Sequence, residues 1–395
     1  MSSIQFSRAA SFTVATLALV GCFIASGVPV PLYNLYRVEN GITDADLALT
    51  TVFYLLCTAL SLLFFGRLSN HLGRRTVVFG AVLTALAGCL VFMQVQSLPV
   101  LILGRALQGI ACGAASSAAG AMAIDFSPRS RLRWLPSVVT SNLPIFAIPV
   151  GAIASGVLVE YFPHPRILSF AIMASILAIV AVLIPFCPET ADRKPGALRS
   201  LIPRVEIPQG AGRAVFATGA GLLATWSWGG FFQAFSPGLT SDYLGTSNAL
   251  AIAVVFASFT ILSPLGGAAS ARIRAVPSLR LGLVLFSISV VLIAVTLHAG
   301  SILWLLLAAL VAGFFNGQSN NSGMRAVFEY VTPSGRAGTL ATIYLISYLC
   351  SAVPGLFAGE LSRHLPIPHI ASLYAGLAIF GTLVALIVAR PKATK

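Results

Sequence analysis

Charged residues are scarce in this sequence. Asp, Glu, Lys and Arg make up only 9% of its 395 residues, whereas hydrophobic residues make up 57%. A soluble domain of this length needs far more charge on its surface. Apolar stretches of about 20 residues, enough to cross roughly 30 Å of hydrocarbon, also recur throughout the chain. The composition excludes a soluble globular protein and indicates an α-helical membrane protein with many spans.

The sequence also lacks the patterns of metal sites, disulfide frameworks and ATP-driven pumps. Its six cysteines lie in or at the ends of apolar segments, without a CxxC pair or a Cys/His metal spacing. There is no GxxxxGK[ST] loop that could cradle the phosphates of ATP. The five histidines fall in loops or at segment boundaries, and no nucleophile with a neighbouring base is visible. We therefore expect no cofactor, no metal and no enzymatic activity.

Charged and turn-forming residues divide the apolar part of the chain into twelve segments. We predict transmembrane helices over residues 10–36, 47–66, 76–95, 98–124, 134–159, 166–187, 214–237, 248–270, 279–297, 301–327, 338–359 and 367–389. Residues 188–213 are charged and contain Pro and Gly, which is typical of a linker. The predicted fold is an all-α integral membrane protein with an amino-terminal six-helix bundle (1–187), a cytoplasmic linker (188–213) and a carboxy-terminal six-helix bundle (214–395).

Positive charges sort to one side of the predicted membrane. With the amino terminus inside, all but four of the 24 Lys and Arg residues fall in inner loops and tails. The outer side carries Arg37, Arg166 and Arg363, and the fourth exception lies within a span. Because Lys and Arg in short loops set orientation, we expect both termini to be cytoplasmic. The net charge of +13 then reflects topology in a lipid bilayer, and without a long basic run we expect no nucleic-acid partner.

The two halves of the chain repeat a pattern. An acidic residue, an aromatic residue, Pro and Arg follow the fourth predicted span in residues 125–131 and the tenth in residues 329–336. Aligning the two acidic residues places Gly109 on Gly313 and Gly113 on Gly317 without a gap. Internal repeats of this kind are typical of transporters, which bind their substrates near the middle of the membrane.

The loop between the second and third predicted spans carries a more specific motif. Residues 66–75, GRLSNHLGRR, resemble the G-x-x-x-D-x-x-G-R-R loop of the major facilitator superfamily. Two glycines and two arginines match this pattern, namely Gly66, Gly73, Arg74 and Arg75. The resemblance extends over the whole chain and implies the twelve-helix major facilitator fold.

One position of this loop departs from the family pattern. Asn70 replaces the usual Asp, and it can cap the following helix but cannot hold a carboxylate ion pair. In the family, the first Arg of the motif pairs with an acidic residue at the inner end of span four, where this chain has Asp125. The resemblance therefore implies an Arg74–Asp125 pair that would lock the outward-open arrangement of the amino-terminal half.

A second stretch resembles the family's span-four motif. In residues 101–113, LILGRALQGIACG, the resemblance implies that Arg105 and Gln108 face the central cavity and that Arg105 takes part in proton coupling. The span-five antiporter signature is only partly present, because Ile148 stands where the family has Gly before Pro149. The resemblance further implies a small-molecule substrate, protons as a possible coupling ion and a monomer. The high Arg content and the short central linker favour a bacterial inner membrane.

Arg105 is the one Lys or Arg that lies well inside a predicted span, away from its ends, and no Asp, Glu, Lys or His lies at the centre of any span. A cavity that selects cations is expected to present a carboxylate. The pattern favours a neutral, zwitterionic or anionic substrate, whose carboxylate or phosphate Arg105 would bind with two hydrogen bonds. In the alternative, Arg105 is structural and binds backbone carbonyls or Asn and Gln side chains.

Polar and aromatic residues within the spans are further candidates for substrate binding or coupling. They are Asn34, Asn142, Trp226, Trp228, Gln233, Asn316, Gln318, Asn320, Asn321, Tyr344 and Tyr348. The four amides within residues 316–321 cannot all face lipid, although some can bridge helices without binding a ligand.

Two functional hypotheses follow from the resemblance. The first is a secondary active transporter that moves a small organic solute by alternating access, with proton-linked export. The second is an uptake carrier or uniporter for a polar nutrient or organic anion, which the absent carboxylate and the amide cluster support. Collapse of a proton gradient would stop an antiporter and leave a uniporter equilibrating.

Overall fold

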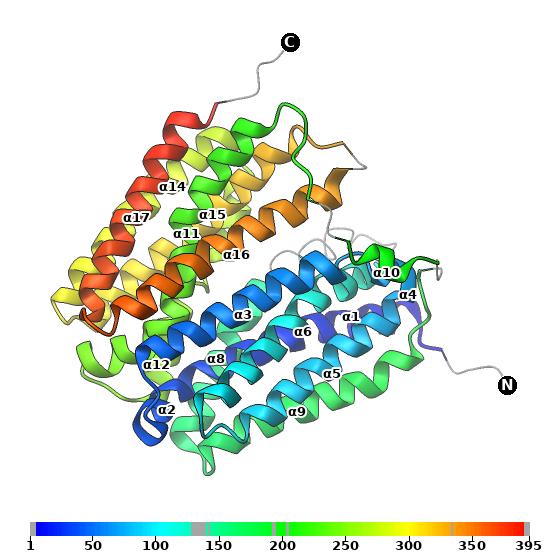
Figure 1. The fold of residues 1–395 in the computed structure, drawn as a ribbon, viewed down its shortest axis with the longest axis horizontal. Coiled ribbons are helices and arrows are strands. Elements are labelled where there is room, and N and C mark those ends of the chain that lie inside the picture. Colours follow the sequence, from blue (N-terminus) through cyan, green and yellow to red (C-terminus); the bar gives the residue numbers. More distant parts are fainter. Residues whose placement is uncertain are drawn as a thin grey trace. The chain divides into compact units, whose positions relative to one another are not determined.

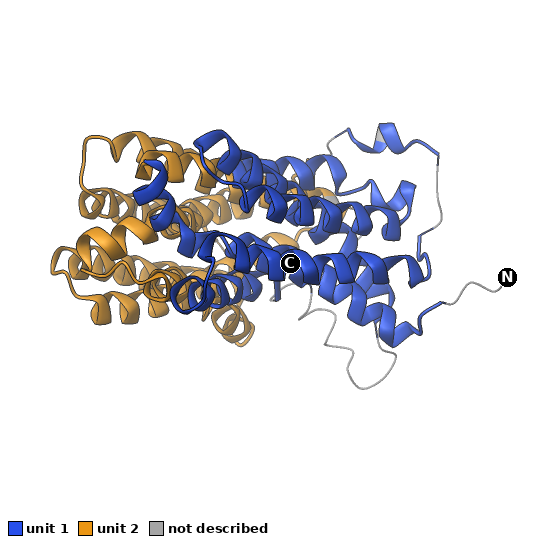
Figure 2. Ribbon diagram, turned by 90° about the horizontal axis from the view of Figure 1, so that it is seen from below, with its two compact units in different colours: residues 1–41, 53–203 blue, residues 42–52, 204–395 orange. Residues whose placement is uncertain are grey.

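The computed structural model describes residues 5–127, 140, 143–191, 195–202, 205–332 and 335–390. All regular secondary structure in this described part is helical. The chain divides into two compact units (Figure 2): residues 1–41 with 53–203 form unit 1, and residues 42–52 with 204–395 form unit 2. Residues 42–52, which the predicted domains place in the amino-terminal bundle, therefore group with unit 2.

Unit 1 consists of long apolar helices joined by short connections (Figure 1). Its helices are α1 (Arg8–Gly27), η1 (Val30–Leu32), α2 (Tyr33–Asn40), the later part of α3 (Asp44–Phe65), α4 (Ser69–Leu72), α5 (Arg74–Phe92), α6 (Leu98–Asp125), α8 (Leu143–Tyr161), α9 (Pro165–Leu183), η2 (Ile184–Phe186) and α10 (Ala197–Ser200).

Unit 2 repeats this long-helix construction. Its helices are α11 (Gly212–Gly238), η3 (Leu239–Tyr243), α12 (Ala249–Ser258), α13 (Ser263–Ser270), α14 (Ala275–His298), α15 (Ile302–Phe328), α16 (Arg336–Leu361) and α17 (Ile367–Val388).

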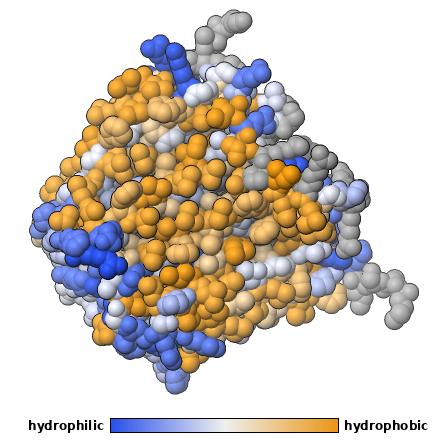
Figure 3. Space-filling model, in the orientation of Figure 1, coloured by the Kyte–Doolittle hydropathy of each residue, from blue (hydrophilic) through white to orange (hydrophobic). Residues whose placement is uncertain are grey.

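Eleven segments in the described part of the chain are long and apolar enough to cross a membrane. The helix α11 has the length, at 27 residues, but Gly, Ser and Gln residues along it lower its hydropathy. Apolar side chains cover most of the face seen in Figure 3. The protein is thus an all-α, multi-pass membrane protein, and α11 is the segment that the sequence analysis counts as the seventh of twelve spans.

Two of the predicted spans are interrupted by proline. The first span breaks between α1 and η1, at Pro29 and Pro31. The eighth, predicted as one helix over 248–270, consists of α12 and α13 separated by a turn. Pro264 lies in the first turn of α13 and has no N–H to continue the helical ladder. At the first interruption, backbone carbonyls need other hydrogen-bond donors. At the second, the carbonyl oxygen of Thr260, four residues before Pro264, accepts from the N–H of Ser263 in the turn.

The repeated glycines mark close helix crossings in each unit. A Cβ atom on Gly113 of α6 would lie 2.6 Å from the Cβ of Ser61 in α3, and one on Gly317 of α15 would overlap the carbonyl oxygen of Ser263 in α13. Because small residues let backbones approach closely, the repeat conserves the same kind of crossing in both units. This packing needs no ligand to explain it.

Candidate functional site

Arg105 lies in the amino-terminal third of α6 with none of its surface exposed. Its Nη1 donates hydrogen bonds to the carbonyl oxygen of Ser26 at 2.8 Å and to Oε1 of Gln108 at 3.1 Å, and its Nε donates to the hydroxyl of Tyr33. The guanidinium carbon lies 5.1 Å from the centre of the Tyr33 ring and 5.5 Å from that of Tyr54. Arg105 is therefore held by residues of α1, α2, α3 and α6.

The break in the first span leaves a backbone carbonyl to which Gln108 of α6 donates a hydrogen bond. Pro29 has no N–H, so the carbonyl oxygen of Ala25 loses its helical partner, and Nε2 of Gln108 donates to it at 2.7 Å. The carbonyl oxygen of Val28 accepts from the hydroxyl of Ser155 in α8 at 2.8 Å. Side chains from two other helices thus satisfy the backbone groups that the broken helix leaves open.

Arg105 is a buried charge without a carboxylate partner. Among the described residues it forms no ion pair, and its Nη2 has no hydrogen-bond partner. A guanidinium removed from water is costly unless its donors are used. These hydrogen bonds agree with the structural alternative for Arg105, in which it binds a backbone carbonyl and a Gln side chain, while Nη2 has no partner among the described residues.

Two tyrosines complete this cluster. Tyr33 and Tyr54 contact the guanidinium directly, and Tyr33 is fully buried. Tyr33 follows Pro29 and Pro31 and is a candidate from the sequence for that reason, whereas no sequence signal indicates Tyr54. Asn34, which is a candidate, is half-buried and accepts a hydrogen bond from Arg37 at 3.3 Å.

The amide cluster of α15 separates onto different faces of the helix. Nε2 of Gln318 donates to the hydroxyl and the carbonyl oxygen of Ser278 in α14, both at 3.3 Å. Nδ2 of Asn321 donates to the carbonyl oxygen of Gly267 at 2.8 Å and to the hydroxyl of Ser270 at 2.7 Å, both in α13. These two amides bridge helices.

The other two amides face α11. Nδ2 of Asn320 donates to Oδ1 of Asn316 at 2.8 Å, and the hydroxyl of Thr225 lies 3.0 Å from Oδ1 of Asn320. Asn316 and Asn320 are both half-buried. Since they are four residues apart, they share one face of α15 and form a polar strip with Thr225.

The aromatic candidates of unit 2 lie in two environments. Trp228 is fully buried, donates from Nε1 to the carbonyl oxygen of Tyr374 at 3.2 Å and packs edge-on against Phe231. Trp226 meets Tyr348 edge-to-face, with ring centres 5.3 Å apart. Trp228 thus belongs to the packed interior of the unit.

Three candidates from the sequence remain, namely Gln233, Tyr344 and Asn142. Gln233 is buried and Tyr344 is half-buried. Asn142 lies outside the described residues.

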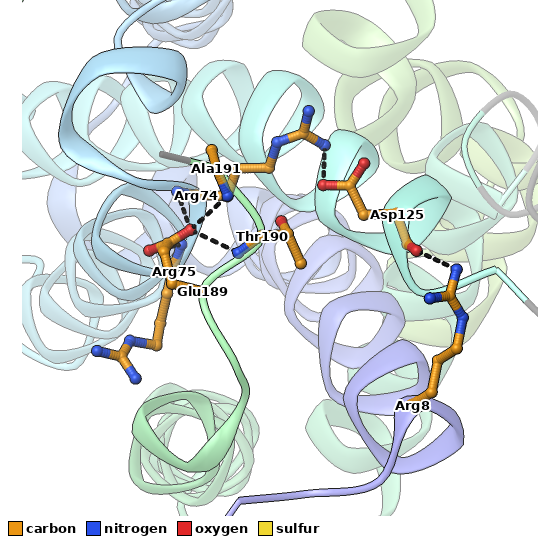
Figure 4. A network of polar contacts seen from close by, with 7 residues as sticks. All are labelled: Arg8, Arg74, Arg75, Asp125, Glu189, Thr190 and Ala191. Atoms are coloured by element: carbon orange, nitrogen blue, oxygen red, sulfur yellow. Dashed lines mark hydrogen bonds and ion pairs between the residues drawn. The ribbon is translucent and has the colours of Figure 1, made fainter. Parts of the chain in front are cut away.

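The motif loop forms an ionic network where α5 begins and α6 ends (Figure 4). Nη1 of Arg74 lies 2.5 Å from Oδ2 of Asp125, so the structure contains the pair that the resemblance implies. The carboxylate of Glu189 accepts from the backbone N–H of Arg74 at 2.8 Å and of Arg75 at 3.2 Å. Asn70 is exposed, and Glu189 provides the negative charge at the start of α5.

Arginine side chains also cap helix ends in this network. Arg8 donates to the backbone carbonyls of Asp125 and Ser127 at the end of α6, as Figure 4 shows for Asp125. Arg75 donates to the carbonyls of Pro185 and Cys187 after α9, at 3.1 and 3.3 Å. Cations at helix carboxy termini are stabilising. The sequence alone does not indicate these roles of Glu189 and Arg8, because their partners are distant in the chain.

Comparisons with known proteins agree with this architecture. The family model described as Major Facilitator Superfamily matches residues 15–217, just over half of the chain. The chain is 29% identical over 179 residues to the multidrug resistance protein MdtL of Klebsiella pneumoniae, a match that covers 44% of each chain. It is 28% identical over 137 residues to multidrug resistance protein D of Escherichia coli, covering 35% of this chain and 34% of that protein.

A relative with a different name matches a similar stretch. The chain is 27% identical over 152 residues to the uridine/deoxyuridine transporter of Lactococcus lactis, covering 38% of this chain and 31% of that protein. In all three comparisons the matched segment spans less than half of the relative's length. The family model, the helical architecture and the motif network point to one conclusion: the chain belongs to the Major Facilitator Superfamily.

Proposed function

We propose that this protein is a secondary active transporter that moves a small organic solute across the membrane by alternating access, in proton-linked export. It acts without enzymatic chemistry, as a monomer in a bacterial inner membrane, with both termini in the cytoplasm. Family membership supports transport, and the names of the two multidrug resistance relatives support export. The sorting of Lys and Arg to one side supports the orientation.

The buried charge of Arg105 is the observation that carries the substrate class. The guanidinium is fully buried, has no ion pair among the described residues, and keeps Nη2 as a donor without a partner there. An anionic or zwitterionic solute would neutralise this charge, and a neutral solute with an acceptor oxygen would satisfy the donor. A cationic solute would add a second positive charge at the same place, which costs free energy in a low-dielectric interior. We therefore propose a neutral, zwitterionic or anionic substrate.

In unit 2 we propose the polar strip on α11 and α15 as the substrate-contacting surface. Asn316, Asn320 and Thr225 are joined by hydrogen bonds of 2.8 and 3.0 Å, and the Trp226–Tyr348 pair provides aromatic surface in the same unit. Half-buried amides can exchange their mutual bonds for bonds to a solute at little cost. Gln318 and Asn321, in contrast, serve as helix bridges.

The motif network is proposed as the conformational lock of unit 1. The Arg74–Asp125 pair is partly exposed, with 19% and 27% of the two side chains accessible, so it can open without a large desolvation change. The bonds of Glu189 to the first backbone N–H groups of α5 fix the loop that presents Arg74. A weak ion pair on a rigid support suits a contact that must break in each transport cycle.

A transport assay in proteoliposomes tests this function. The probes are three radiolabelled solutes: an amphipathic carboxylate, the neutral nucleoside uridine and a hydrophobic ammonium cation. We expect an imposed proton gradient to drive movement of the carboxylate or uridine, and an ionophore to stop it. Arg105→Gln should abolish this movement, whereas the matched control Arg363→Gln, at an exposed pair with Glu360, should not. Gradient-driven movement of the cation by both variants would contradict the proposal.

The second candidate is an uptake carrier or uniporter for a polar nutrient or organic anion. The similarity to a uridine/deoxyuridine transporter and the amide strip of α15 favour it. The same assay separates the two candidates, because a uniporter equilibrates its solute after the ionophore is added. Equilibration of uridine without a gradient would replace the first candidate by the second.

A further inference from the structure

Two histidines from different helices of unit 2 lie together at one end of the unit. His298 is the last residue of α14, and His369 lies in the first turn of α17. Their ring centres are 5.7 Å apart and the ring planes are inclined by 68°. Both side chains are exposed to solvent. Neither residue takes part in the proposed transport site or in the ionic network of unit 1.

The hydrogen bond of His298 determines which of its ring nitrogens can act as a ligand. Its Nδ1 lies 2.7 Å from the carbonyl oxygen of Ala294, which can only accept, so Nδ1 carries the proton. The lone pair of the neutral ring is then on Nε2. A ring that donates one N–H to a backbone carbonyl has the arrangement of metal-binding histidines, whose second nitrogen is fixed in this way.

The ring of His369 can also offer a nitrogen to a metal ion. Among the described residues, the ring nitrogens of His369 have no hydrogen-bond partner, and its ring lies against the ring of His298. A metal ion bound about 2.1 Å from one nitrogen of each ring places the ring centres roughly 5 to 6 Å apart. The observed spacing of 5.7 Å fits this arrangement.

We propose that His298 and His369 form a two-histidine binding site for a divalent transition metal ion, which joins α14 to α17. Imidazole nitrogen selects Ni²⁺, Cu²⁺ or Zn²⁺ over Mg²⁺ and Ca²⁺. No third His, Cys, Asp or Glu completes a cluster in the described ranges, so water fills the remaining coordination positions. Such a site binds metal reversibly and responds to metal outside the protein interior.

Calorimetric titration of the full-length protein with Ni²⁺ tests the proposal. The protein is purified in detergent through a tag without histidines, and the variants are His298→Ala, His369→Ala and the matched control His364→Ala. His364 is also exposed and lies five residues before His369, but it is not part of the ring pair. We expect one equivalent of Ni²⁺ to bind the wild type and His364→Ala, and each of the other variants to bind at least tenfold more weakly.

Thermal unfolding gives a second readout. A metal that binds only the folded protein raises its unfolding temperature by mass action. Ni²⁺ should raise that temperature for the wild type and His364→Ala, leave it unchanged for the two pair variants, and lose its effect in acid because protons compete for imidazole. Mg²⁺ should have no effect on any of the four proteins. Absence of stoichiometric Ni²⁺ binding to the wild type, or equal binding by all four, would overturn the proposal.

Discussion

The break in the first span makes a quantitative prediction about Gln108. Its Nε2 donates to the carbonyl oxygen of Ala25, which has no helical donor because residue 29 is proline. Both Gln108 and Ala25 have none of their surface exposed. Substitution Gln108→Ala therefore leaves a buried carbonyl without a partner, in a place that water cannot easily reach.

The expected cost is large for a single side chain. A buried acceptor left unpaired costs about 1–3 kcal/mol. Gln108 also accepts a hydrogen bond from Arg105 at 3.1 Å, and loss of a bond to a charged group costs about 1.5–3 kcal/mol. We expect Gln108→Ala to lower the free energy of unfolding by about 3–5 kcal/mol.

A second substitution isolates the role of proline. In Pro29→Ala, residue 29 regains an N–H that can donate to the carbonyl of Ala25, so that carbonyl no longer depends on Gln108. We expect Gln108→Ala to cost about 1–3 kcal/mol less in the Pro29→Ala background than in the wild type. The four proteins form a double-mutant cycle that is measured by reversible unfolding in detergent. Equal costs in both backgrounds, within about 0.5 kcal/mol, would refute the reasoning.

Two further predictions concern packing and capping in unit 1. A Cβ atom on Gly27 would overlap the carbonyl oxygen of Ile148 in α8, whereas nothing lies within 4 Å of one on Gly80, so Gly27→Ala should lower stability by about 3 kcal/mol and Gly80→Ala should not lower it. Thermal denaturation of both variants checks this, and equal melting temperatures would contradict the crossing geometry. Glu189→Ala should cost about 1–2 kcal/mol, because it removes the acceptor for the first N–H groups of α5. The exposed control Glu360→Ala should leave unfolding unchanged, and a similar loss in both would argue against a capping role.

The order and the approximate positions of the long helices follow from the sequence, but the breaks within the helices do not. Hydropathy located most of the long helices to within a few residues, because a segment that crosses a bilayer must be apolar over its whole length. The fifth span, predicted over 134–159, corresponds to α8, which the structure gives as Leu143–Tyr161. Hydropathy placed a single helix over 248–270, where the structure has a turn between α12 and α13. A proline in a membrane helix can produce a kink or a break, and the outcome depends on donors from neighbouring helices. Those donors come from residues far away in the chain.

The candidate site was predictable only in part, because its contacts also join residues that are far apart in the chain. The motif and its family resemblance indicated the Arg74–Asp125 pair, which lies between residues 51 positions apart. The spacing of Asn316 and Asn320 places them on one face of a helix, but it does not say that they face Thr225. The sequence also left open whether Arg105 binds backbone carbonyls or a ligand. The structure shows its bonds to the broken α1 and a remaining donor, so both roles are compatible with one side chain.

The most direct test of the account is ligand-dependent thermal stabilisation of the purified wild type, Arg105→Gln and the control Arg363→Gln. The panel contains carboxylates, zwitterions, neutral nucleosides and hydrophobic cations at one pH, and a ligand that binds the folded state raises its unfolding temperature. The account predicts that carboxylates, zwitterions or nucleosides stabilise the wild type and Arg363→Gln but not Arg105→Gln. Equal stabilisation of all three proteins by hydrophobic cations would contradict the proposed role of the buried guanidinium.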